Sequence, residues 1–229
     1  MRLLLISSSV VHGYGFLDHS EPDIRRILEG RRSVAFVPFA QHDQDAYTAR
    51  VRERFDAMGG FSVTQVREKK DIESAEAIFV GGGNTFRLLD RMYATDLLDA
   101  IRARVKDGIP YIGSSAGTNI AAPTIKTTND MPIVFPPSFD ALGFVPFQIN
   151  PHYLDPDPGS THKGETREER LREYLEENTV PVVGLREGCS LWVEDDRITL
   201  LGEKTARLFR RGEDPEEVVW SAVALTTAL

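Results

Sequence analysis

The stretch "YIGSSAGTN", Tyr111–Asn119, joins a short apolar run directly to a row of small residues. The apolar run is typical of a buried strand, and the small residues after it allow a tight turn into a helix. Glycines stand two residues before and two residues after Ser115, a G-x-S-x-G pattern that places a serine on a strained turn at the rim of a sheet. The stretch therefore predicts a strand–turn–helix unit of an α/β protein, with Ser115 rather than Ser114 as the candidate nucleophile.

The same order of apolar run and amphipathic stretch recurs along the chain. Further apolar runs begin at Arg2, Ser33, Phe61, Ala77, Phe147 and Val180. Helical spacing of apolar residues marks the ranges Asp45–Met58, Thr85–Tyr93, Asp96–Lys106 and Glu165–Asn178. Such alternation predicts right-handed crossovers and a three-layer α/β fold, in which a mostly parallel central sheet is flanked by helices. After Gly184, closely spaced strand-like runs predict a C-terminal antiparallel edge on the same sheet.

Composition limits the class of protein. The chain has 229 residues, of which 41% are hydrophobic and 27% charged, so we expect a single α/β domain over residues 1–229. The net charge of −8 argues against a general binder of nucleic acid or anionic membranes, because such binding needs clustered cations. The lone Cys189 excludes an internal disulfide, and no Cys/His spacing suggests a zinc site, so we expect neither metal nor cofactor.

Because the sequence has no apolar run long enough for a membrane span, we expect a cytoplasmic location. A homodimer is compatible with the sequence.

A glycine-rich turn follows one of the predicted strands. In an open parallel sheet, ligands bind beyond the carboxyl ends of the strands, so residues that follow strands are candidates for the site. In "GGGNTF", Gly81–Phe86, the glycines let backbone amides approach a ligand. The amides of Gly82 and Gly83, together with that of Ala116 directly after Ser115, are candidate donors for an oxyanion hole. The turn lacks the lysine of a phosphate-binding loop.

A serine nucleophile needs a base, and His152 in "INPHY" follows a short predicted strand. His162, in a polar loop, is a weaker rival. Two carboxylates are candidates for holding the imidazole in its productive tautomer. Glu187 in "LREGCS" follows a strand and therefore shares the rim with Ser115 and His152, whereas Asp130 in "KTTNDMP" lies in the connection after the nucleophile helix. Strand-end geometry favours Glu187 over Asp130 as the carboxylate that holds the imidazole of His152.

Taken together, "GGGNTF", "GSSAGTN", "TTNDMPI", "INPH" and "HKGETR" are far more specific than any one of these motifs. The sequence resembles, over about residues 3–190, the peptidase E family of serine peptidases, the α-aspartyl dipeptidases, whose fold is similar to that of class I glutamine amidotransferases. The resemblance implies that Ser115 is the nucleophile and His152 its base. It puts Asp130 first as the third member of the charge relay, with Glu187 as the alternative.

The resemblance also implies a reaction, the hydrolysis of dipeptides with an N-terminal aspartate (Asp-|-Xaa) through an acyl-enzyme. Arg167 in "HKGETR" is the candidate partner for the aspartyl side chain, because a guanidinium can bind a carboxylate with two parallel hydrogen bonds. Lys126 and Lys163 are held in reserve for that role. Two other functions stay open: a cyanophycinase-like peptidase acting on β-aspartyl linkages, and a non-catalytic small-molecule-binding protein on the same fold.

Overall fold

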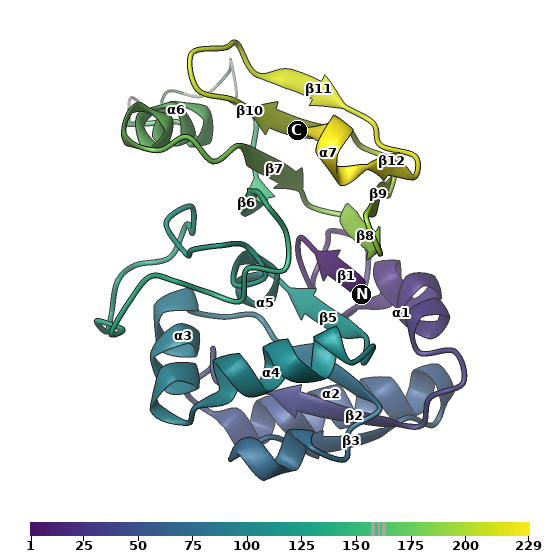
Figure 1. The fold of residues 1–229 in the computed structure, drawn as a ribbon. Helices are drawn as coiled ribbons and strands as arrows, with labels where there is room; N and C mark the ends of the chain where they lie inside the picture. Colours follow the sequence, from purple (N-terminus) through teal and green to yellow (C-terminus); the bar gives the residue numbers. More distant parts are fainter. Residues whose placement is uncertain (157–158, 160, 162–163) are drawn as a thin grey trace.

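The molecule contains two β-sheets, and the smaller one lies at the top of the view in Figure 1. We describe them from a computed structural model covering residues 1–156, 159, 161 and 164–229. Within this part of the chain the larger sheet has eight strands in the order β12-β9-β8-β1-β5-β4-β2-β3. They are β1 (Arg2–Ile6), β2 (Ser33–Val37), β3 (Ser62–Gln65), β4 (Ala77–Val80), β5 (Tyr111–Ser114), β8 (Ser190–Glu194), β9 (Arg197–Leu201) and β12 (Val223–Ala224). Strands β1 to β5 run parallel, while β8, β9 and β12 are antiparallel to their neighbours.

Helices cover both faces of the larger sheet and make the three predicted layers. The helices are α1 (Glu21–Ile27), α2 (Gln44–Gly59), α3 (Thr85–Ala94), α4 (Leu97–Lys106), α5 (Ala116–Asn119), α6 (Arg167–Glu177) and α7 (Leu225–Ala228), with 3-10 turns η1 (Asp18–Ser20) and η2 (Lys69–Ile72). Alternate residues of β1 point to opposite faces, because successive side chains of a strand alternate. Leu3 and Leu5 join the core under α3 and α4, and Leu4 and Ile6 join the core under α1 and α2. The predicted fold class is therefore confirmed.

The four predicted helical ranges correspond to α2, α3, α4 and α6 to within two residues at each end. Their capping explains these limits. Asn84 caps α3 by accepting a hydrogen bond from the Arg87 amide, and Thr166 caps α6 in a reciprocal capping box with Glu169.

The predicted C-terminal antiparallel edge is present as β8, β9 and β12. The prediction of one sheet is wrong for the other strands of the C-terminal half, which form a second sheet with the order β11-β10-β7-β6. Its strands are β6 (Gln148–Tyr153), β7 (Val182–Arg186), β10 (Ala206–Phe209) and β11 (Glu216–Val218). The reason is that β1 is already paired on both sides, with β5 in parallel and with β8 in antiparallel orientation. The parallel pair β6–β7 therefore cannot pair beside β1 and forms part of the smaller sheet.

Ser7, directly after β1, joins the ends of strands from both sheets. Its buried hydroxyl donates to the carbonyl oxygen of Leu185 at 2.7 Å and accepts from the amide of His152 at 2.9 Å. The Ser7 amide donates to the Cys189 carbonyl at 3.1 Å. The carboxyl ends of β1, β6 and β7 thus meet at one point, although they do not belong to one sheet.

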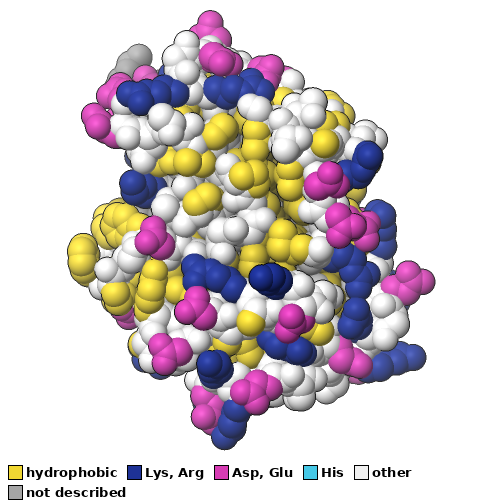
Figure 2. Space-filling view, viewed as in Figure 1, with side chains coloured by type: hydrophobic (Ala, Val, Ile, Leu, Met, Phe, Trp, Pro, Cys, Tyr) yellow, Lys and Arg dark blue, Asp and Glu magenta, His cyan; other side chains and the backbone are white. Residues whose placement is uncertain are grey.

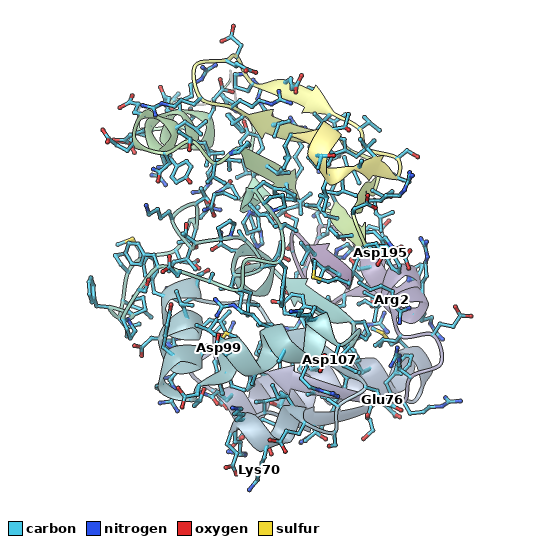
Figure 3. The ribbon with its side chains drawn as sticks, in the orientation of Figure 1. Arg2, Lys70, Glu76, Asp99, Asp107 and Asp195 are labelled. Carbon is cyan, nitrogen blue, oxygen red and sulfur yellow. The ribbon has the colours of Figure 1, made fainter. Side chains whose placement is uncertain are left out.

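The surface carries charges of both signs. On the face shown in Figure 2, acidic and basic side chains are interspersed, with apolar side chains between them. Among the charged residues labelled in Figure 3, Arg2 begins β1, and the others come from helices, 3-10 turns and loops around the larger sheet. No helix among the described residues is long and apolar enough to cross a membrane.

Candidate active site

Ser115 occupies the strained turn between β5 and α5. Its φ of 53° and ψ of −109° lie outside the regions that most residues adopt, and such strain concentrates at functional sites. The flanking glycines are required by packing: a Cβ on Gly117 would lie 2.1 Å from the Val80 carbonyl oxygen, and one on Gly113 would lie 2.5 Å from the Gly117 carbonyl oxygen. The close strand-to-helix contact lifts the Ser115 side chain to the rim of the sheet.

His152 lies opposite Ser115 on an irregular part of β6. The register between β6 and β7 shifts between Pro151 and Tyr153, so His152 occupies a bulge, and its φ is 55°. A bulge re-aims a side chain, and the Ser7 hydroxyl holds the His152 amide in this conformation. The imidazole Nε2 then lies 2.9 Å from Ser115 Oγ.

Glu187 completes a chain of hydrogen bonds. Its Oε1 lies 2.6 Å from His152 Nδ1, directly after β7 ends. Because an ionised carboxylate only accepts, Nδ1 carries the proton, which leaves Nε2 free to accept the Ser115 hydroxyl proton. The His152 and Glu187 side chains are 35% and 39% exposed, so the pair lies at an open rim and is partly solvated.

Asp130 lies near this chain but is engaged elsewhere. Its Oδ2 accepts from the amide of Thr85 at 2.7 Å, from the Thr85 hydroxyl at 2.6 Å and from the Thr128 hydroxyl at 3.2 Å. This carboxylate sits at the start of α3, where the helix dipole favours a negative charge. Since both ring nitrogens of His152 are already taken by Ser115 and Glu187, the structure does not place Asp130 in contact with the imidazole.

The three expected oxyanion donors differ in their availability. The Gly82 amide donates to the Tyr47 hydroxyl at 3.0 Å, so it is not free. In the part of the chain that the structure describes, the amides of Gly83 and Ala116 have no acceptor. Gly83 is held with φ at 139°, and a Cβ there would lie 2.5 Å from the Ala40 carbonyl oxygen. Tyr47 lies in the first turn of α2, where the sequence offers no signal of its role.

Two cavities, each of about 380 Å³, meet at Ser115 and His152. The first, which we call the Arg167 cavity, is also lined by Asp130, Thr128, Leu154 and Glu187. The second, which we call the Arg50 cavity, is also lined by Phe16, Asp43, Tyr47 and Gly83. The cleft around the serine therefore offers one arginine on each side.

Arg167 begins α6 and is partly buried in its cavity. Burial and then the nearby Arg170 lower the pKa of its guanidinium from the usual value, while the negative charge of Asp130 opposes this shift. Its hydrogen-bond donors have no carboxylate partner among residues 1–156 and 164–229. A charged, partly desolvated guanidinium with free donors is suited to bind a carboxylate of a ligand.

The remaining candidates lie elsewhere. Lys126 Nζ donates to Asn178 Oδ1 at 3.1 Å, beyond the end of α6, and does not line the Arg167 cavity. His162 and Lys163 lie outside the described residues. Cys189 is buried, and burial raises the pKa of its thiol, which disfavours the thiolate that a nucleophile needs.

No group of three or more His, Cys, Asp or Glu side chains is placed to hold a metal ion within the described part of the chain. Ser7, like Tyr47, is a residue of the site that sequence reasoning missed. Ser7 directly follows β1 in the same way as Glu187 directly follows β7, so the strand-end rule offered the signal.

A serine on a strained turn, bonded to a histidine that bonds a carboxylate, is the arrangement that serine hydrolases use, here on an α/β fold. Comparison with known proteins gives the family. Residues 3–201 match the model of peptidase family S51, and the chain belongs to this family. The family expected from the motifs is thereby confirmed, and the chain is a peptidase.

Similar proteins span nearly the whole chain. Peptidase E of Streptomyces coelicolor is 60% identical over 222 residues, which cover 95% of this chain and 91% of that protein. A probable alpha-aspartyl dipeptidase of Drosophila melanogaster is 51% identical, covering 95% of this chain and 93% of that protein. Among solved structures, a putative peptidase E from Listeria monocytogenes has a TM-score of 0.67 at 22% identity, with 89% of this chain and 98% of that chain covered, and it supports the fold.

Proposed function

We propose that the chain is a serine dipeptidase that hydrolyses Asp-|-Xaa dipeptides with Ser115 as nucleophile, His152 as base and Glu187 as the orienting carboxylate. The hydrogen-bonded chain from Ser115 through His152 to Glu187 is the observation that carries this proposal. Glu187 takes the role that the resemblance assigns first to Asp130, because Glu187 contacts Nδ1 while Asp130 is bonded to Thr85.

The mechanism follows from the proton positions. His152 Nε2 takes the hydroxyl proton as Ser115 Oγ attacks the scissile carbonyl carbon. The amides of Gly83 and Ala116, both without acceptors among the described residues, are suited to bind the oxygen that becomes negative. His152 then donates its proton to the leaving amine, which breaks the peptide bond and leaves an acyl-enzyme. Water, deprotonated by the same imidazole, releases aspartate and restores Ser115.

The Arg167 cavity supports the choice of an aspartyl substrate. An N-terminal aspartate carries a side-chain carboxylate and an α-ammonium, so its site needs a cation and an acceptor. Arg167 supplies the cation, and Asp130, in the same cavity, supplies a negative charge. The names of the relatives, peptidase E and probable alpha-aspartyl dipeptidase, agree with this choice.

Cleavage of α-linked Asp-Leu tests the proposal, with β-linked Asp-Leu as a second substrate. We expect the wild-type protein to cleave the α-linked dipeptide and Ser115→Ala to lose nearly all of that activity. Preference for the β-linked dipeptide would instead support a cyanophycinase-like activity. Absence of cleavage of either dipeptide would support a non-catalytic binding protein.

A homodimer and a cytoplasmic location also stay proposals. The long connection between α5 and β6 supports the dimer, because it exposes several large apolar side chains. These are Met131, Ile133, Val134, Phe135 and Phe139. Light scattering coupled to gel filtration would give the mass in solution, and a monomer across micromolar concentrations would contradict a stable dimer.

A further inference from the structure

The Arg50 cavity lies on the side of Ser115 away from Arg167, and the proposed mechanism leaves it without a role. Ser115 and His152 belong to both cavities. If the N-terminal aspartate of the substrate occupies the Arg167 cavity, the chain passes Ser115 and the leaving residue enters the Arg50 cavity. His152 protonates the leaving amine and also lines the Arg50 cavity, so it would lie beside the leaving residue.

Arg50 is held at this cavity without a charged partner. Its guanidinium carbon lies 4.1 Å from the centroid of the Phe16 ring, a cation–π contact that restrains the side chain. Within the residues that the structure describes, no carboxylate pairs with this guanidinium. The acid that shares the cavity, Asp43, caps α2 by accepting from the Ala46 amide at 2.9 Å. The planar donors of Arg50 are thus available to a ligand.

The leaving residue of a dipeptide ends in an α-carboxylate, which an internal residue of a longer peptide lacks. We infer that Arg50 binds this α-carboxylate and thereby selects dipeptides, while the rings of Phe16 and Tyr47 border the leaving side chain. This inference rests on the proposed dipeptidase activity and adds the recognition of the leaving residue. A guanidinium restrained by an aromatic ring loses little freedom on binding a carboxylate, so two parallel hydrogen bonds form at low entropic cost.

The matched substrates are Asp-Leu and Asp-leucinamide, which differ only in the terminal carboxylate. We expect the wild-type protein to prefer Asp-Leu in kcat/KM by about 10-fold, the lower end for hydrogen bonds to a charged group, because the site is open to water. Arg50→Met should lower kcat/KM for Asp-Leu by about the same factor, mainly through KM, and leave Asp-leucinamide within about 2-fold of wild type.

Arg52→Met provides the control. Arg52 lies two residues further along α2, and its Nε donates to the Val63 carbonyl oxygen at 3.0 Å, away from the cavity. This variant removes the same charge and should keep the wild-type preference for the acid. Equal losses on both substrates in Arg50→Met, no loss on either, or a wild-type protein that does not distinguish them would overturn the inference. Failure of the wild-type protein to cleave Asp-Leu would instead refute the dipeptidase proposal itself.

Discussion

Replacing Glu187 by glutamine removes the charge beside His152 while keeping the size of the side chain. The 2.6 Å contact between Glu187 Oε1 and His152 Nδ1 stabilises the imidazolium that forms when Ser115 attacks. Two opposite charges about 4 Å apart interact by about 4 kcal/mol at an effective dielectric constant of about 20. Because the two side chains are 35% and 39% exposed, water screens the pair and this value is an upper limit. We therefore expect kcat to fall by about 10²- to 10³-fold, or about 3 to 4 kcal/mol.

Steady-state kinetics on Asp-Leu measures this loss, with Asp130→Asn as the matched control. Asp130 belongs to the Arg167 cavity but not to the hydrogen bonds of the imidazole. Its replacement should therefore raise KM more than it lowers kcat, since it weakens binding of the substrate ammonium. The reasoning is refuted if Asp130→Asn lowers kcat more than Glu187→Gln does, or if Glu187→Gln retains wild-type kcat.

Three further predictions concern stability. Ser114→Ala should keep or raise the free energy of unfolding, by up to about 1 kcal/mol in urea titration, because the buried Ser114 hydroxyl has no partner among the described residues. Gly117→Ala should lower it by about 1 to 3 kcal/mol, since a Cβ would lie 2.1 Å from the Val80 carbonyl oxygen; an unchanged midpoint would show that the turn can relax. The Arg186 side chain lowers the pKa of Glu217 from 4.5 to about 2 in the folded protein. Between these two pH values the unfolded state binds more protons than the folded state, so the free energy of unfolding falls as pH falls. Thermal midpoints of Glu217→Gln should therefore depend less on pH between 4.5 and about 2 than those of the wild type, and parallel curves would count against the ion pair.

Much of the site was predictable because strand ends meet at a common edge. The turn around Ser115 is fixed by local sequence, since two glycines must pack against backbone oxygens. Glu187 follows its strand as expected, whereas His152 lies inside β6, on the bulge near its carboxyl end. Strand-end geometry favoured Glu187 over Asp130. The resemblance pointed the other way, and motif spacing alone does not show that Asp130 accepts from Thr85.

Other features depend on contacts between distant segments and could not be predicted. The division into two sheets follows from the pairing of β8 with β1, which local patterns in the sequence do not encode. The engagement of the Gly82 amide by Tyr47 joins residues 35 positions apart. The position of Arg50 beside the serine likewise requires the packing of α2 against the rim.

The central claim is that Ser115 is a nucleophile activated by His152, and covalent labelling tests it most directly. The protein is incubated with an organophosphonate serine reagent, digested and analysed by mass spectrometry. The account predicts a single adduct on Ser115, which is lost in Ser115→Ala and strongly slowed in His152→Ala. No adduct, or an adduct on Ser114 or another serine with Ser115 unmodified, would contradict it.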